Sequence, residues 1–352
     1  MELESDRTHA VMKKSLLKSP MFCTSLLITL GLLTILPLDV ATAGGASEIW
    51  LSGISPGVRQ KMFQESQSDY FGLFKQDAAW SKSAQQVKVF MINGGLLLRQ
   101  SDDEVKAVFA DLKRRHIALA IEMGLATARQ DSSGHQACGT GVEGMTTPNA
   151  TRVIAERIRK NGGELRYVAM DEPLWYGYHF SGANACHFAM NELAGAIAPN
   201  VAVLRELFPA VEIGDVEPIG AAKNVPPDWV EEIARWTEVY QQVVRQKLRF
   251  FHADIVWASS WQQQLGAVKR VAHEHGLKFG VIYDGGGTGK QESDALWTQE
   301  AVERFQMVES NPATLPDHAV FQSWARWPHN MLPEDQPGTM TWLVNQYVGT
   351  KH

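Results

Sequence analysis

Acidic side chains recur along the chain at the points where short apolar runs end. Glu122 lies at the end of one such run, and Asp171 and Glu172 follow another. The full set, which includes one amide, is Asn93, Glu122, Asp171, Glu172, Asp215, Glu217, Asp254 and Asp284. Helix capping explains some of the Asp and Asn residues, but Glu is a poor N-cap residue. A cluster of carboxyl groups can keep one member protonated and another ionised near neutral pH, as general acid–base catalysis requires.

Aromatic side chains stand beside these acids, several of them in a Gly-containing segment. They are Trp175, Tyr176, Tyr178, His179, Phe180, Trp257, Trp261, Tyr283, Trp324 and Trp327. A single Trp is more often a core residue, but the set as a whole favours a sugar platform. Aromatic rings stack on the C–H face of a pyranose while carboxylates bind its hydroxyls. The expected substrate-binding residues are Asp171, Asn93, Glu122, Trp175, Tyr178, Asp215, Asp254, Trp257, Tyr283 and Trp324.

The elements that must position these residues alternate between strands and helices. The expected strands are 48–53, 87–93, 117–123, 165–171, 211–215, 250–257, 278–284 and 319–324. The expected helices include 101–115, which opens on a capping box, and 151–161, 227–247, 265–275 and 339–347. Such alternation predicts an α/β fold, a single-domain (β/α)8 TIM barrel with its chemistry at the carboxyl ends of the strands. An open doubly wound sheet would need a Gly-rich fingerprint after its first strand, which residues 51–56 do not supply.

The first residues carry the three parts of a secretory signal peptide. Lysines at 13, 14 and 18 precede an apolar run over 21–36, and Ala41-Thr42-Ala43 follows as a cleavage site. The alternative is an uncleaved membrane anchor, for which the run is short. We therefore expect a signal peptide over 1–43 and the barrel over 44–352, in a periplasmic or secreted protein without stable membrane insertion after cleavage.

Only two cysteines remain after residue 43, and their pairing depends on the compartment. In an oxidising compartment, Cys138 and Cys186 suggest one disulfide, with two free thiols as the alternative.

The overall composition excludes several classes of protein. Hydrophobic residues make up 45% and charged residues 20%, as in ordinary globular chains. The 33 basic and 39 acidic residues give a net charge of −6, and no basic block is present. A nucleic-acid partner or an anionic membrane surface is not expected, because both need clustered Lys and Arg. No cofactor is expected, and nothing in the sequence shows the oligomeric state.

The segment Met170-Asp171-Glu172-Pro173 resembles a known motif. It is similar to the Asn-Glu-Pro at the end of strand 4 in the large clan of (β/α)8 glycoside hydrolases that includes cellulases, xylanases and β-galactosidases. The resemblance implies a carbohydrate substrate, the role of general acid/base for Glu172, and a sugar contact for Trp324.

Two positions depart from the pattern of that clan. Asp171 stands where the clan has Asn, and Asp284 stands near the place of the strand 7 nucleophile Glu. We expect Asp284 to be the catalytic partner of Glu172, with Glu217 as a third catalytic candidate. Retention and inversion both stay open, because they depend on the distance between the carboxyl groups.

Three other functions compete with glycoside hydrolysis. His252 and Asp254, together with Glu172, Glu217 and Asp284, could form the oxygen-rich metal site of a sugar isomerase or epimerase. The Gly-rich segment 285–290 resembles a phosphate cradle but fails the P-loop pattern, and a loop over the sugar site is the preferred interpretation. An exported saccharide-binding barrel without catalysis is the remaining alternative.

Overall fold

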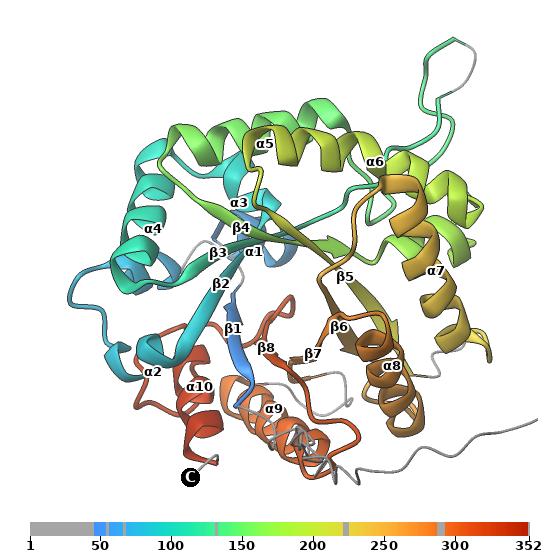
Figure 1. Cartoon of the computed structure of the whole chain (residues 1–352). Coiled ribbons are helices and arrows are strands. Elements are labelled where there is room, and N and C mark those ends of the chain that lie inside the picture. The colour runs from blue at the N-terminus through green and yellow to red at the C-terminus, as the bar shows by residue number, and fades with distance from the viewer. Residues whose placement is uncertain are drawn as a thin grey trace, which may run out of the picture. The chain divides into compact units, whose positions relative to one another are not determined.

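The computed structural model describes residues 46–53, 56–65, 68–130, 133–220, 225–286 and 293–350. Within them, eight parallel strands close into a barrel in which each strand pairs with the next and β8 pairs with β1 (Figure 1). The strands are β1 (Glu48–Ser52), β2 (Val87–Asn93), β3 (Ala118–Met123), β4 (Leu165–Asp171), β5 (Glu212–Ile219), β6 (Phe250–Ile255), β7 (Lys278–Tyr283) and β8 (His318–Phe321). The predicted TIM barrel is confirmed.

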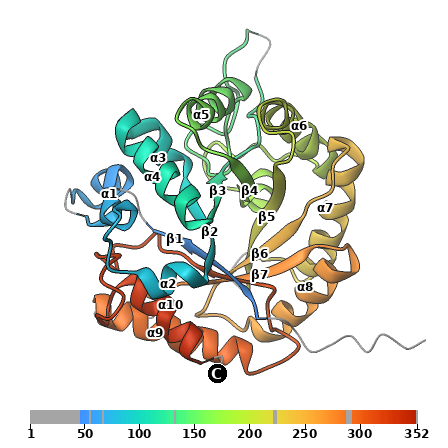
Figure 2. The same ribbon diagram turned by 60° about the vertical axis from the view of Figure 1, so that its left-hand side comes forward.

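Helices surround the strands on the outside of the barrel (Figure 2). They are α1 (Pro56–Phe63), α2 (Ser81–Gln86), α3 (Gly94–Arg99), α4 (Asp102–Arg115), α5 (Pro148–Lys160), α6 (Met190–Leu207), α7 (Trp229–Val244), α8 (Gln262–Glu274), α9 (Asp294–Glu309) and α10 (Met340–Gly349), with a 3-10 turn η1 (Tyr70–Phe74) and a π-helical turn η2 (Trp175–His179). The predicted capping box is present, because the Ser101 side chain accepts from the Glu104 backbone and the Glu104 side chain from that of Ser101.

Strand boundaries agree closely with the sequence patterns except at two strands. β5 continues to Ile219 and includes Pro218. Proline lacks a backbone N–H and therefore usually marks the end of a strand in a sequence. β8 ends at Phe321, so residues 322–324 leave the sheet.

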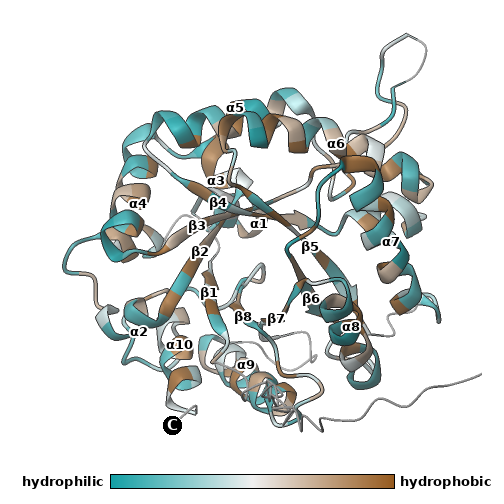
Figure 3. Cartoon of the chain, in the orientation of Figure 1, coloured by the Kyte–Doolittle hydropathy of each residue, from teal (hydrophilic) through white to brown (hydrophobic). Residues whose placement is uncertain are grey.

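Side chains on successive strand positions point alternately into the barrel and out toward the helices. The inward layer of the interior contains Trp50, Val89, Met91, Ala120, Ala169, Val216, Phe250, Ile282 and Val320. The outward positions pack against the helices in a larger apolar layer, and Figure 3 shows the apolar colour concentrated on the strands. This alternation decides which of the acidic residues can reach the interior of the barrel.

The predicted disulfide is present, since Cys138 bonds to Cys186 with an S–S distance of 1.93 Å. It joins the β3–α5 connection to the β4–α6 connection. The predicted signal peptide lies outside the described residues, and no helix among those described is long and apolar enough to cross a membrane.

Candidate functional site

A cavity of about 330 Å³ lies at the carboxyl end of the barrel. Each strand contributes one residue to its lining, near the carboxyl end of the strand or just beyond it. These are Ser52, Asn93, Glu122, Asp171, Val216, Asp254, Ile282 and Gln322. Residues from the strand ends and connections complete the lining, namely Gly53, Met62, Glu143, Glu172, Tyr176, Ser323 and Trp324. Six residues that the sequence singled out as site candidates line this cavity: Asn93, Glu122, Asp171, Glu172, Asp254 and Trp324.

Glu172 is held directly above the end of β4 by an unusual backbone conformation. Its φ angle is +43°, in the left-handed region that non-glycine residues rarely adopt. Its carbonyl oxygen accepts a hydrogen bond from the Tyr176 backbone N–H at 3.0 Å, which anchors the turn into η2. Strained residues of this kind cluster at functional sites, because the surrounding fold must hold them in place.

The surroundings of the Glu172 carboxyl disfavour its ionisation. Burial, followed by the nearby negative charges of Asp254, Asp171 and Glu143, raises its pKa to about 10. Its side chain is hydrogen-bonded to Asp254, which also disfavours its ionisation. Burial and the charge of Asp284 raise the pKa of Asp254 to about 7, against the lowering effect of that hydrogen bond from Glu172. The surroundings thus disfavour the ionisation of Glu172 more strongly than that of Asp254.

Burial also raises the pKa values of the other two acids that stand at strand ends in the cavity. Burial raises the pKa of Glu122 to about 7, opposed by the hydrogen bonds from Gln322. The Gln322 Nε2 atom lies 2.8 and 2.7 Å from the two Glu122 carboxylate oxygens. Burial, and next the charge of Glu122, raises the pKa of Asp171 well above its usual range. The cavity therefore concentrates carboxyl groups that oppose one another's ionisation.

Glu143 is a lining residue that the sequence analysis missed. It comes from the β3–α5 connection, which folds back over the strand ends because Gly124 and Gly144 permit close backbone contact. A Cβ atom on Gly144, whose φ is +76°, would lie 2.8 Å from the Asp171 carbonyl oxygen. Burial, and next the nearby Glu143, raises the pKa of the Tyr176 hydroxyl. The signal available in the sequence was the series of glycines before Glu143 and the presence of Cys138 in the same connection.

Asp284 lies in an adjoining cavity of about 250 Å³, which shares Ser323 and Trp324 with the first. The Arg304 Nη1 atom is 3.0 Å from the Asp284 carboxylate, and the Trp257 indole N–H donates to it at 2.5 Å. Burial raises its pKa to about 6, against the opposing charge of Arg304. The expected partner of Glu172 thus sits in an ion pair outside the cavity that Glu172 lines, and Trp257 lies with it.

Three predicted site residues face away from the barrel interior. Asp215 accepts a hydrogen bond from the Trp236 indole at 2.9 Å, and the Tyr283 hydroxyl donates to Glu309 at 2.9 Å. Glu217 accepts the backbone N–H groups of Leu174 and Trp175 at 2.6 and 3.0 Å. All three predicted residues are fully buried, and none lines the cavity. The prediction overlooked the pleat, which points odd-numbered positions of β5 and β7 toward the helices.

Trp175 and Tyr178 belong to η2 and do not line the cavity either. Their rings pack on His179, with centroid distances of 6.0 and 4.7 Å. Trp175 also meets Trp229 edge to face at 5.9 Å. These aromatic rings therefore pack against one another and stabilise the turn that follows Glu172.

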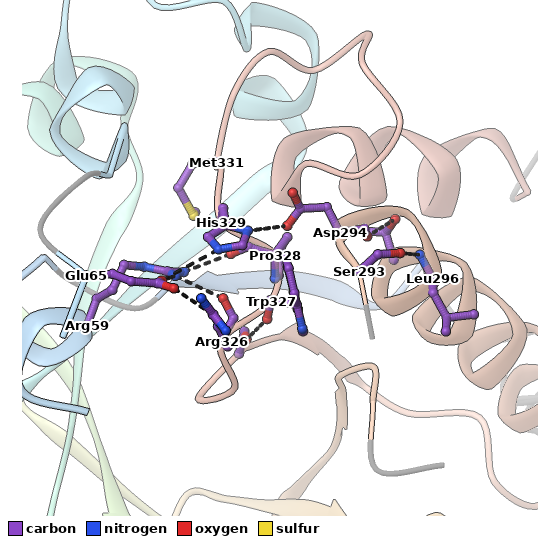
Figure 4. A network of polar contacts seen from close by, with 12 residues as sticks. Arg59, Glu65, Ser293, Asp294, Leu296, Arg326, Trp327, Pro328, His329 and Met331 are labelled. Atoms are coloured by element: carbon purple, nitrogen blue, oxygen red, sulfur yellow. Dashed lines mark hydrogen bonds and ion pairs between the residues drawn. The ribbon is translucent and has the colours of Figure 1, made fainter. Parts of the chain in front are cut away.

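A polar network holds the segment that follows Trp324 (Figure 4). Glu65 binds the buried Arg59 at 2.9 Å, Arg326 at 2.6 Å and His329 at 3.6 Å. Arg59 also donates to the Arg326 carbonyl oxygen at 2.9 Å. Trp324 itself is 40% exposed, so its ring lies at the mouth of both cavities.

The proposed metal constellation is not assembled. His252 is fully buried one inward position below Asp254, where its ring meets Trp50 at 4.8 Å and its Nε2 lies 3.1 Å from His318 Nδ1. No group of three or more His, Cys, Asp or Glu residues in the described part of the chain is arranged to hold a metal ion. Of the Gly-rich segment 285–290, only Gly285 and Gly286 are described; they line the cavity of Asp284.

No model of a known family and no curated protein matches the sequence. Solved structures do match. The catalytic domain of a GH26 endo-β-1,4-mannanase from Bacillus sp. JAMB-750 is 12% identical over 86% of each chain, with a TM-score of 0.50. A double mutant of an endo-β-1,4-mannanase from Cellulomonas fimi is 10% identical over 86% of this chain and 70% of its own, also at 0.50.

A barrel of different chemistry is equally similar. The carboxyl transferase domain of Rhizobium etli pyruvate carboxylase is 7% identical over 87% of this chain and 47% of its own, with a TM-score of 0.50. At such identities the likeness shows the fold alone. The chain thus resembles TIM-barrel glycoside hydrolases in architecture, and its function must be argued from the site.

Proposed function

We propose that this protein is an enzyme that hydrolyses glycosidic bonds of an oligo- or polysaccharide, with Glu172 as its general acid. The observation that carries the proposal is the place of Glu172, a carboxyl with a pKa raised to about 10, beside Asp254 in an acid-lined cavity at the carboxyl end of the barrel. Glycosidases need one carboxyl that donates a proton and a second that is ionised. Trp324 at the mouth supplies an aromatic face for a sugar ring.

Asp254 is the proposed nucleophile. Two carboxyl groups in hydrogen-bond contact are closer to the roughly 5–5.5 Å separation of a retaining pair than to the roughly 6.5–9.5 Å of an inverting pair. The Glu172 proton passes to the glycosidic oxygen as the C–O bond breaks, and an Asp254 oxygen forms a bond to the anomeric carbon. Glu172 then takes a proton from water, whose oxygen attacks that carbon and releases Asp254. The anomeric configuration is retained.

The export of the protein is part of the same proposal. A signal peptide over 1–43 would deliver the barrel to the periplasm or the medium, and the Cys138–Cys186 disulfide supports an oxidising compartment. Large saccharides are available to a hydrolase in such a compartment without uptake.

The test uses residues 44–352 and the Glu172→Gln variant, incubated with a panel of polysaccharides and assayed for new reducing ends. We expect release by the wild type and a loss of about 10²- to 10⁴-fold in the variant, because Gln cannot donate an acidic proton. The first product anomer, followed by NMR, is expected to be retained. A variant as active as the wild type would contradict the proposal.

A saccharide-binding barrel without catalysis is the second candidate. The observation that favours it is Ile282, which lines the cavity from β7, the strand that carries the nucleophile in the similar glycoside hydrolase clan. Binding of one saccharide by both proteins, without reducing ends from either, would establish this candidate and exclude the first.

A further inference from the structure

Glu217 has no part in the reaction proposed above, yet its carboxyl binds the turn that carries Glu172. Its side chain is fully buried on β5 and does not line the cavity. Each carboxyl oxygen accepts one backbone N–H, from Leu174 at 2.6 Å and from Trp175 at 3.0 Å. A buried carboxyl needs such donors, because burial without them is unfavourable. The two bonds thus join β5 to the residues that directly follow Glu172 and Pro173.

The register of the sheet explains why Glu217 reaches this turn. β4 and β5 pair as far as Asp171 and Val216, after which β4 ends and β5 continues to Ile219. Glu217 is therefore level with Glu172 on the neighbouring strand. Because Val216 lines the cavity, the pleat directs Glu217 away from it, and there its carboxyl meets the start of η2.

The first three backbone N–H groups after Glu172 are all committed. Pro173 has no N–H, so Leu174 supplies the first donor and Trp175 the second, both to Glu217. Tyr176 supplies the third, to the Glu172 carbonyl oxygen at 3.0 Å. The φ angle of +43° at Glu172 persists only if the surroundings hold it. Two of the three bonds that hold it end on one side chain.

We propose that Glu217 is a positioning residue, whose two hydrogen bonds hold the turn so that the Glu172 carboxyl stays beside Asp254. The positioning stands on this geometry alone, and its consequence for catalysis rests on the proposed function. Both oxygens are required as acceptors. A carboxyl oxygen can accept an N–H in either protonation state, whereas the amide nitrogen of a Gln cannot.

Charged groups around Glu217 come from several elements. Burial raises the pKa of Glu217, followed by the charges of Asp215 on the same strand and of Glu172, and the two backbone N–H groups lower it. η2 also carries His179, which pairs with Glu232 of α7. A variant that removes the charge of Glu217 must therefore be compared with one that keeps it.

The first experiment follows the titration of Glu172 by carboxyl ¹³C NMR in residues 44–352, with Glu172→Gln to assign its signal. Burial and the charges of Asp254, Asp171 and Glu143 raise the pKa of Glu172 in the wild type. A carboxyl that leaves this position loses their influence, so the pKa should fall by about one pH unit or more in Glu217→Gln. Glu217→Asp should lower it as well, because it keeps the charge but withdraws both oxygens by one methylene group.

Asp215→Asn is the matched control. Asp215 is equally buried on the same strand, but its carboxylate binds the Trp236 indole at 2.9 Å instead of the turn. We expect the pKa of Glu172 to be unchanged in this variant. An unchanged pKa in both Glu217 variants would overturn the inference. So would a fall in Glu217→Gln alone, since the effect would then be one of charge and not of position.

The second experiment compares two substrates on each variant. One is the saccharide found in the hydrolysis assay, whose leaving group needs a proton; the other is the 2,4-dinitrophenyl glycoside of the same sugar, whose leaving group does not. In both Glu217 variants we expect kcat/KM to fall about 10²-fold for the first and less than about five-fold for the second, because a misplaced acid affects only assisted departure. The ratio of the two values on one sample does not depend on the fraction of folded enzyme.

The outcomes separate the two proposals. Equal losses for both substrates would overturn the inference and leave hydrolysis by Glu172 intact. A fall in the pKa of Glu172 in both variants, with no hydrolysis of any substrate by the wild type, would uphold the positioning and refute the proposed function. Circular dichroism checks that each variant is folded, and Glu217→Asp decides alone where Glu217→Gln is not.

Discussion

At the scale of single residues, the geometry of Glu172 and Asp254 determines the chemistry proposed for the barrel. A left-handed backbone at Glu172 turns its side chain into the cavity, where burial and neighbouring acids keep it protonated. Asp254 enters from β6 by the pleat of that strand, two residues beyond the buried His252. The different pKa shifts of the two carboxyls therefore arise from their surroundings and not from their residue types.

The pH dependence of activity follows from these two groups. In the proposed mechanism, turnover requires ionised Asp254 and protonated Glu172, whose pKa values are raised to about 7 and about 10. We expect kcat/KM to rise with pH through about 7 as Asp254 loses its proton, and to fall as Glu172 ionises near pH 10. Because the two groups are in contact, the apparent values belong to the pair. A profile that peaks below pH 5 would contradict this assignment; initial rates across pH 4–11 measure it.

At the scale of secondary-structure elements, the pleat of the strands separates site residues from packing residues. The sequence patterns were sufficient to predict eight strands and to identify their acidic ends. Counting alternate positions from the apolar interior would also have excluded Asp215, Glu217 and Tyr283, which face the helices. Glu143 was beyond such a count, because it lies in a long connection whose path depends on tertiary contacts and a disulfide.

The β3–α5 connection provides an element-scale prediction. In Gly144→Ala the new methyl group would meet the Asp171 carbonyl oxygen, at a backbone conformation with φ of +76° that alanine disfavours. We expect the connection to shift, withdrawing Glu143 from the cavity and lowering kcat by about 10- to 100-fold. Gly141→Ala is the matched control, since Gly141 has a φ of +73° but nothing within 4 Å of an added Cβ. Equal activity in the two variants would show that the close contact is unimportant.

At the scale of the whole molecule, one covalent link joins two long connections above the barrel. The Cys138–Cys186 disulfide spans 48 residues of sequence that include α5 and β4. Because the closed loop restricts the unfolded chain, replacing both cysteines by serine should lower the free energy of unfolding by about 2–4 kcal/mol. Chemical denaturation of oxidised wild type and of the double variant measures this difference. Equal stability would mean that the bond does not constrain the chain in solution.

How much of the structure could be predicted from the sequence also differs between the fold and the site. Fold class, strand positions and the disulfide pair followed from periodicity, turn residues and cysteine count, because these are local or compositional signals. The proposed pairing of Glu172 with Asp254 did not follow, since Asp254 and Asp284 both end inward-facing runs and only tertiary contacts distinguish them. Arg304 from α9 and Trp257 hold Asp284 in the adjoining cavity, leaving Asp254 beside Glu172.

The choice between those two aspartates tests the central claim most directly. Once the first assay has identified a substrate, kcat is measured for Asp254→Asn and Asp284→Asn alongside the wild type, with circular dichroism to confirm that each variant is folded. The account predicts a loss on the order of 10³-fold or more in Asp254→Asn and less than about ten-fold in Asp284→Asn. The reverse order would contradict it and make Asp284 the partner of Glu172.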